Sequence, residues 1–298
     1  MLTAEIKQSN RFSLRMKQTI TDKGSDVCYF TELNELIYLF HRKELKISVY
    51  LLDDRLHHQY DIRMGIKQYV PSGFASSETN NCLYIGNRFG DICVYKIIPR
   101  TQQEPDGRVI ALDIKPKAAG ERPQSISTSS DGRWMMLVAI ESAFGRTWGG
   151  RLEVYFDDDT IQYRVSIPRY VINPWCVTFL EDAFAVTYGM FKFGIISLNN
   201  EGAKIAECNE GLSMPRSIRY SSRDKMVYAT DAGNHRILEL NKGLKVVSII
   251  HQWEADDENA NDTLPIRIVP NHDVSRMIIG MDSGRISMYS VIRHNEAN

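Results

Sequence analysis

The sequence predicts an all-β protein, folded as a six-bladed β-propeller of four-stranded antiparallel blades. Three observations lead to this fold. A proline recurs at intervals of about fifty residues, a short alternating strand stands at a fixed place after each proline, and a strand-like N-terminal segment can complete the last blade. The length of 298 residues suits one large all-β domain, and 43% hydrophobic and 24% charged residues are ordinary for a globular chain.

The repeat is visible in the prolines that precede the first strand of five units and in the glycine that occupies the same slot in the first unit. Three residues after each proline comes an apolar or aromatic residue, as expected for a strand that enters the core. The slots are Gly24, Pro71, Pro123, Pro174, Pro215 and Pro265. The predicted blades of the single domain are therefore 24–70, 71–122, 123–173, 174–214, 215–264, and 265–298 together with 10–19.

The third and fourth strands align in the same way. Third strands alternate apolar and polar residues over 45–52, 90–97, 150–157, 193–200, 235–242 and 284–291. Fourth strands are predicted over 58–64, 108–114, 160–167, 203–208 and 245–251. Because the sixth unit has no chain left for a fourth strand, the N-terminal run 10–19 is expected to supply it, closing the ring and removing an open sheet edge.

The best-preserved copy of the repeat is the stretch 214–240. It is predicted to form an antiparallel meander of strands 217–220, 225–230 and 237–240. In the loop between the last two strands, Gly233 and Asn234 tolerate positive φ, and Asp231 can pair with Arg236 across the mouth of the loop. A second structural loop pair is predicted in the last blade, between Asp282 and Arg285.

This stretch resembles an NHL repeat, whose consensus has an early proline, an Asp after the second strand and an Asn-x-Arg-Ile entry to the third. The last blade keeps Asp282-Ser-Gly-Arg285-Ile, whereas the first three blades are as similar to WD-type repeats, as in Gly90-Asp-Ile-Cys-Val-Tyr. The resemblance implies a propeller that binds RNA or proteins with its top face. The chain has no cysteine spacing for the zinc modules that often accompany NHL propellers, so ubiquitin-ligase activity is not implied.

Propeller geometry sorts the loops onto two rims. The loops between strands two and three and those that join blades form the top rim, and the other loops form the bottom rim. The bottom rim is predicted to be acidic and the top rim basic and rich in aromatic residues, although the formal net charge is only −1. The predicted binding residues are Arg88, Phe89, Arg146, Trp148, Lys192, Phe193, His235, Arg236 and Arg285. In the alternative interpretation these side chains serve the turns, and aromatic residues such as Trp175 and Tyr188 pack between blades.

A rigid rim of this composition favours a non-enzymatic binding or scaffold protein that recognises a protein partner. Single-stranded RNA is the alternative ligand, since guanidinium groups hold phosphates and aromatic rings stack on bases. A third hypothesis is a metal-dependent small-molecule hydrolase or lactonase acting in the central channel. We expect no catalytic residue, metal, cofactor or small-molecule substrate, because the innermost strands show no inward carboxylate and no zinc or nucleophile motif occurs.

The cellular location is expected to be the cytoplasm, with the nucleus as the alternative. The N-terminus lacks a signal-peptide pattern, and no apolar run approaches the roughly 18 residues of a membrane span. The five cysteines are an odd set without C-x-x-C spacing, which favours reduced, buried thiols. No membrane association is expected.

Overall fold

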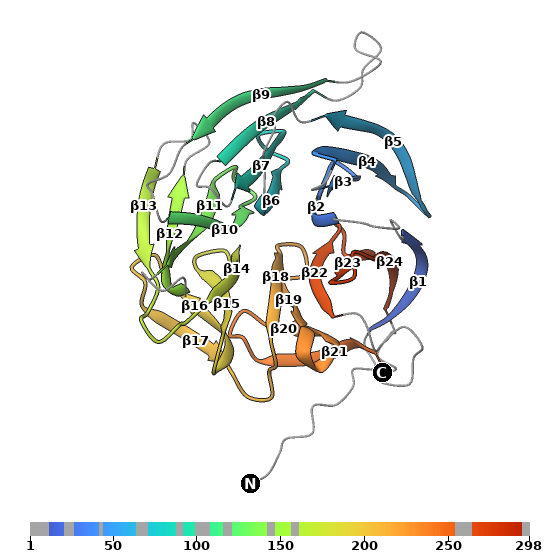
Figure 1. Ribbon diagram of the computed structural model, residues 1–298. Helices are drawn as coiled ribbons and strands as arrows, with labels where there is room; N and C mark the ends of the chain where they lie inside the picture. Colours follow the sequence, from blue (N-terminus) through green and yellow to red (C-terminus); the bar gives the residue numbers. More distant parts are fainter. Residues whose placement is uncertain are drawn as a thin grey trace.

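The predicted fold is confirmed: six four-stranded antiparallel sheets form a ring (Figure 1). The structure is a computed structural model of the chain. It describes residues 12–20, 27–41, 44–63, 71–87, 92–98, 108–115, 121–141, 147–155, 161–253 and 264–293. Within these residues the only helical element is the short 3₁₀ turn η1, Ala232–Asn234.

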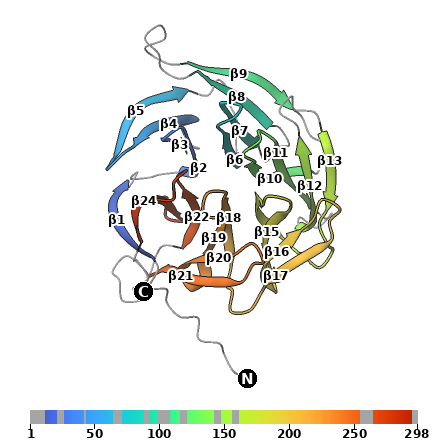
Figure 2. The same cartoon turned by 180° about the vertical axis from the view of Figure 1, so that it is seen from behind.

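Each blade is a meander whose first strand lies innermost (Figures 1 and 2). Blade one contains β2 (Val27–Leu33), β3 (Leu36–His41), β4 (Lys46–Leu52) and β5 (Leu56–Arg63). Blade two contains β6 (Pro71–Ser77), β7 (Cys82–Asn87), β8 (Ile92–Ile98) and β9 (Arg108–Lys115). Blade three contains β10 (Glu121–Thr128), β11 (Trp134–Glu141), β12 (Thr147–Tyr155) and β13 (Ile161–Ser166).

The second half of the ring continues the pattern. Blade four contains β14 (Pro174–Phe179), β15 (Phe184–Gly189), β16 (Phe193–Leu198) and β17 (Lys204–Cys208). Blade five contains β18 (Pro215–Ser221), β19 (Met226–Asp231), β20 (Arg236–Leu240) and β21 (Val246–Gln252). Blade six contains β22 (Pro265–Pro270), β23 (Arg276–Met281), β24 (Ile286–Arg293) and, from the other end of the chain, β1 (Phe12–Ile20).

The N-terminal strand closes the ring as predicted. Strand β1 pairs antiparallel with β24, from Phe12 opposite Arg293 to Ile20 opposite Ile286, with an irregularity between Met16 and Gln18. Both ends of the chain are thereby tied into one sheet (Figure 2). Because β24 gains a partner along its length, no row of unpaired backbone groups is left at that position.

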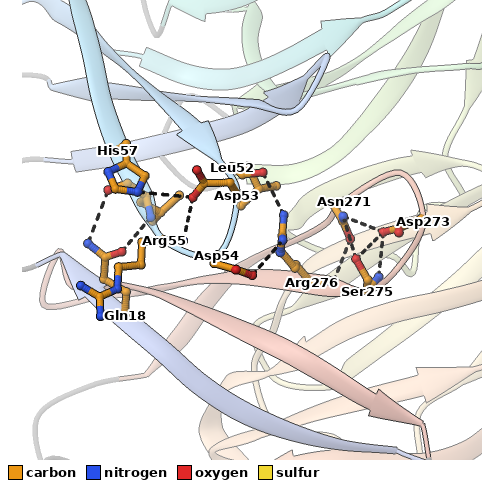
Figure 3. Close-up of polar contacts among 11 residues, drawn as sticks. Gln18, Leu52, Asp53, Asp54, Arg55, His57, Asn271, Asp273, Ser275 and Arg276 are labelled. Carbon is orange, nitrogen blue, oxygen red and sulfur yellow. Dashed lines mark hydrogen bonds and ion pairs between the residues drawn. The ribbon is translucent and has the colours of Figure 1, made fainter.

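Side chains of the bottom rim reinforce the closure (Figure 3). The amide of Gln18 on β1 accepts a hydrogen bond from the N–H of Leu56 at 2.7 Å and donates one to its carbonyl at 3.5 Å. Arg276, at the start of β23, donates to the carbonyl of Leu52 at 2.9 Å and lies 3.6 Å from a carboxylate oxygen of Asp54. These contacts join blade six, including its N-terminal strand, to blade one.

One edge of each innermost strand has no strand partner. Some of the backbone N–H groups on this edge donate hydrogen bonds to hydroxyl groups of the preceding blade. This explains why these strands are rich in serine and threonine, since an unpaired buried N–H is costly. The bonds run from Val177 N–H to Ser125 Oγ (3.3 Å), from Tyr220 N–H to Thr178 Oγ1 (3.1 Å) and from Ile268 N–H to Ser217 Oγ (3.3 Å).

The core lies between adjacent blades. Between blades two and three, the fully buried Trp134 stacks on Tyr155 with ring centroids 3.9 Å apart and on Tyr84 with centroids 5.0 Å apart. Alternating strand residues point to the two neighbouring blades, so every blade is covered on both faces. The result is a rigid ring that holds the loops of both rims in place.

Candidate functional site

Five of the nine predicted binding residues have described side chains. Lys192, Phe193, His235, Arg236 and Arg285 lie in or beside the top-rim loops between strands two and three of blades four, five and six. The other four side chains lie outside the described part of the structure. They are Arg88, Phe89, Arg146 and, although its backbone belongs to β12, Trp148.

A buried carboxylate, that of Asp231, organises the top-rim loop of blade five. Its Oδ2 accepts hydrogen bonds from Arg236 Nε and Asn234 Nδ2, both at 2.7 Å, and its Oδ1 accepts one from Ser213 N–H at 2.7 Å. Arg236 also donates to the carbonyl of Gly211 at 2.7 Å. Because Asp231 is fully buried and Arg236 is nearly so, this network fastens the connection from blade four to the loop of blade five.

The backbone of this loop does not use the tolerance of Gly233 and Asn234 for positive φ. The turn η1 keeps Gly233 and Asn234 out of the positive-φ region, and the left-handed residue is His235, with φ 50°. Gly233 and Asn234 belong to the 3₁₀ turn, so the left-handed residue comes directly after the turn. Gly233 is required for another reason: a Cβ atom there would lie 2.3 Å from the Oγ of Ser213.

The pairing expected between Asp282 and Arg285 is absent. Asp282 instead accepts a hydrogen bond from Leu264 N–H at 2.7 Å, which ties the loop to the start of β22. The Nε of Arg285 is buried and has no hydrogen-bond partner among the described residues.

Phe193, which was predicted to bind a partner, packs within its own blade. It is half-buried and lies opposite Gly189 in the β15–β16 pair, where a Cβ on the glycine would come 2.1 Å from the ring. Tyr188 lies over Gly194 in the same way and is buried in the core, as expected. Glycine opposite an aromatic residue leaves space for the ring, so these two rings stiffen the blade.

Three exposed residues of the neighbouring loops stand out; the sequence placed Tyr170 and Phe191 among the aromatic residues of the top rim but not among the chosen binding residues. Phe191 is 78% exposed, Tyr170 52% and Met190 39%. Their two loops are joined by hydrogen bonds between Asn173 and Gly189, at 3.1 and 3.2 Å. We call Tyr170, Met190 and Phe191 the rim patch. Large exposed apolar side chains held on a rigid frame are typical of protein interfaces.

A partly desolvated cation also lies on the top rim. The guanidinium of Arg216, at the start of β18, stacks on the ring of Trp175 at the start of β14. Burial lowers the pKa of Arg216 to about 10, and the charge of Asp282 only partly offsets this. Neither Arg216 Nε nor Trp175 Nε1 has a hydrogen-bond partner among the described residues, and no described carboxylate forms an ion pair with Arg216. Such groups favour an incoming anion.

The bottom mouth of the central channel holds a cavity of about 270 Å³, lined by residues from all six blades. Glu32 is among them, which corrects the expectation that the innermost strands carry no inward carboxylate: β2 runs on to Leu33 and includes Glu32. Burial raises the pKa of Glu32 to about 7. The hydrogen bond that Glu32 accepts from Glu35 N–H at 2.9 Å acts in the opposite direction and lowers this pKa. The nearby carboxylates of Glu78, Glu35 and Asp273 raise it further.

This raised pKa of Glu32 leads to a pH-dependent stability. The folded chain keeps the proton up to about pH 7, whereas the unfolded chain releases it near 4.5. Folding is therefore stabilised below pH 4.5, and this contribution is lost as the pH rises through 7. Relative to Glu32→Gln, the wild type is expected to lose about 3 kcal/mol of unfolding free energy between pH 4.5 and 8. Denaturant unfolding at both pH values checks this, and parallel pH profiles of the two proteins would contradict it.

The described residues contain no group of three or more histidine, cysteine, aspartate or glutamate side chains arranged to hold a metal ion. They also contain no helix long and apolar enough to span a membrane.

The resemblance to known proteins lies in the fold. No protein-family model matches the chain, and no curated protein matches it. Among solved structures, a catalytically inactive form of virginiamycin B lyase from Staphylococcus aureus, solved with quinupristin, is similar, with a TM-score of 0.59, 15% identity and coverage of 92% of this chain and 83% of that one. A protein of unknown function from Bacteroides caccae is similar with a TM-score of 0.56, 11% identity and 78% coverage of each chain. At these identities the likeness establishes a propeller, and neither NHL nor WD membership is confirmed.

Proposed function

We propose that this chain is a non-enzymatic binding protein whose top rim recognises an acidic segment of a protein partner. One observation carries the proposal: the top rim combines exposed apolar side chains with a partly buried guanidinium that forms no ion pair in the described structure. The apolar part is the rim patch, and the cation is Arg216. Aromatic residues, methionine and arginine are the side chains enriched at interface hot spots.

The chemistry of the partner follows from the two parts. A carboxylate that reaches Arg216 would supply the ion pair that this guanidinium lacks in the described structure. An apolar residue next to that carboxylate would cover the rim patch. Because hydrogen bonds such as those of Asp231 already fix the loops, little conformational entropy is lost on binding.

Selection of peptides from a random display library on the full chain tests the proposal. Peptides that combine acidic and aromatic residues are expected to be enriched, and Phe191→Ser and Arg216→Met should each lower their affinity at least tenfold, as for hot-spot residues. The matched control is Met16→Ser on β1, since Met16 is 60% exposed and lies on blade six. Its affinity should stay within twofold of the wild type.

Two outcomes would overturn the proposal. The first is that no acidic peptide is enriched over a counter-selection on the Arg216→Met variant. The second is tight binding of a 20-nucleotide poly-uridine RNA that requires Arg216 and weakens steeply between 50 and 200 mM salt, which would make RNA the ligand. Melting curves of all variants serve as the folding control. Arg216→Met is expected to be at least as stable as the wild type, because it removes a desolvated charge.

A further inference from the structure

The cavity at the bottom mouth of the central channel is separate from the top rim. Its volume of about 270 Å³ is close to the lower limit of roughly 300 Å³ for small-molecule sites. The lining is rich in hydroxyl groups from different blades, among them Thr31, Ser76, Thr128, Thr178 and Ser221. Several of these hydroxyl groups already donate within the protein, as Thr128 does to the carbonyl of Ser76 and Thr178 to that of Phe179, so their oxygens chiefly offer acceptor capacity to a ligand, beside a partly apolar lining.

One side of this cavity carries an unpaired cation. The Nη1 of Arg219 on β18 donates to the carbonyl of Ile218 at 3.0 Å and lies 3.6 Å from the Sγ of Cys176. No carboxylate of the described residues forms an ion pair with Arg219. Arg133 on the same rim, by contrast, forms an ion pair with Asp131 at 2.8 Å.

The thiol next to Arg219 reflects the same positive field. Burial raises the pKa of Cys176, but the guanidinium of Arg219, the hydroxyl of Ser125, a backbone contact at Ile218 and the charge of Arg267 together leave the pKa of this thiol below its usual value. This side of the channel therefore stabilises negative charge.

The other side of the cavity is acidic. Glu32 on β2 and Glu78, just after β6, belong to blades one and two, and the ring places these blades across from Arg219 in blade five (Figure 1). An anion at Arg219 thus faces carboxyl oxygens at its far end, and these accept hydrogen bonds whether or not Glu32 carries its proton. The ligand that fits both sides has a carboxylate at one end and hydrogen-bond donors, either hydroxyl or ammonium, at the other.

We propose that this cavity binds a small carboxylate with hydrogen-bond donors at its far end, and that Arg219 holds the carboxylate. The proposal is independent of the function assigned to the top rim. It differs from the hydrolase hypothesis because it requires neither a metal ion nor a reaction.

Titration calorimetry and ligand-observed NMR with four probes test the proposal. Glycerate and 4-aminobutyrate each carry a carboxylate at one end and hydrogen-bond donors at the other. Propionate lacks the donors, and glycerol lacks the carboxylate. Glycerate, 4-aminobutyrate or both are expected to bind at least tenfold more tightly than propionate and glycerol. Arg219→Met should lower that affinity at least tenfold. Arg223→Met removes an exposed cation of the same rim that does not line the cavity, and should change the affinity less than twofold.

Protein-observed NMR on the wild type keeps the test decisive if Arg219→Met does not fold. Amide shifts on adding the tighter-binding probe are expected at 127–130, 269, 271 and 272, which line the cavity. Three results would overturn the proposal: binding of both-ended probes no tighter than that of propionate and glycerol, affinity unchanged in a folded Arg219→Met variant, or shifts confined to the top rim.

Discussion

Replacing Asp231 by alanine is expected to lower the free energy of unfolding by about 3–5 kcal/mol, because it leaves a nearly buried guanidinium without its partner. The carboxylate of Asp231 is fully buried and accepts hydrogen bonds from Arg236, Asn234 and Ser213. The measurement is denaturant unfolding at pH 7. The matched control is Asp182→Ala, which removes an exposed aspartate without an ion pair in the described structure and should change stability by less than about 0.5 kcal/mol.

A second variant shows whether the ion pair is the cause. In Asp231→Ala/Arg236→Met no charge is left unpaired, so the double variant should be less destabilised than the sum of the two single changes. If the effects simply add, or if Asp231→Ala costs less than about 1 kcal/mol, then the loop is held by other contacts and Arg236 is free to contact a partner instead.

Removing residues 1–20 is expected to cost roughly 5 kcal/mol or more, which is comparable to the whole stability of many domains. The truncation deletes β1, strips β24 of its partner from Ile286 to Arg293 and exposes the unpaired sheet edge. It also removes the Gln18 contacts that join the last blade to Leu56. We expect loss of the soluble monomer, measured by gel filtration and thermal melting.

Adding the missing strand in trans distinguishes strand pairing from a general effect of truncation. A synthetic peptide of residues 10–22 should restore the monomer and its melting transition, because it can pair with β24. A scrambled peptide of the same composition should not. A truncated chain that melts like the full chain without any peptide would show that the ring does not depend on β1.

Strand order and ring closure could be predicted from the sequence because they depend on local patterns. Alternating residues and turn residues placed the third strand of blade one at 45–52, and the structure has Lys46–Leu52. The fourth strand of blade two was predicted at 108–114 and is found at Arg108–Lys115. The role of the N-terminal strand could be predicted by counting strands in each blade. The last blade lacked its fourth strand, and the alternating segment at the N-terminus belonged to no other blade.

The candidate sites could be predicted only in part, because exposure depends on the strand opposite. Phe191 and Phe193 stand two residues apart in the sequence, yet Phe193 begins β16 and packs over Gly189 whereas Phe191 is exposed in the loop. Whether Arg216 forms an ion pair depends on which carboxylates of other blades lie near it, and the sequence does not show this. Glu32 follows the apolar run of the first strand, where a loop is expected, but β2 continues to Leu33 and Glu32 lines the cavity.

The central claim is that the partner lies on the top rim, and hydrogen–deuterium exchange with a saturating selected acidic peptide tests it most directly. Slower exchange is expected over 168–173, 189–193 and 213–216, the segments that carry the rim patch and Arg216. Exchange at 129–132 and 270–275 on the bottom rim should not change. Slower exchange on the bottom rim alone would contradict the assignment of the top rim as the binding surface.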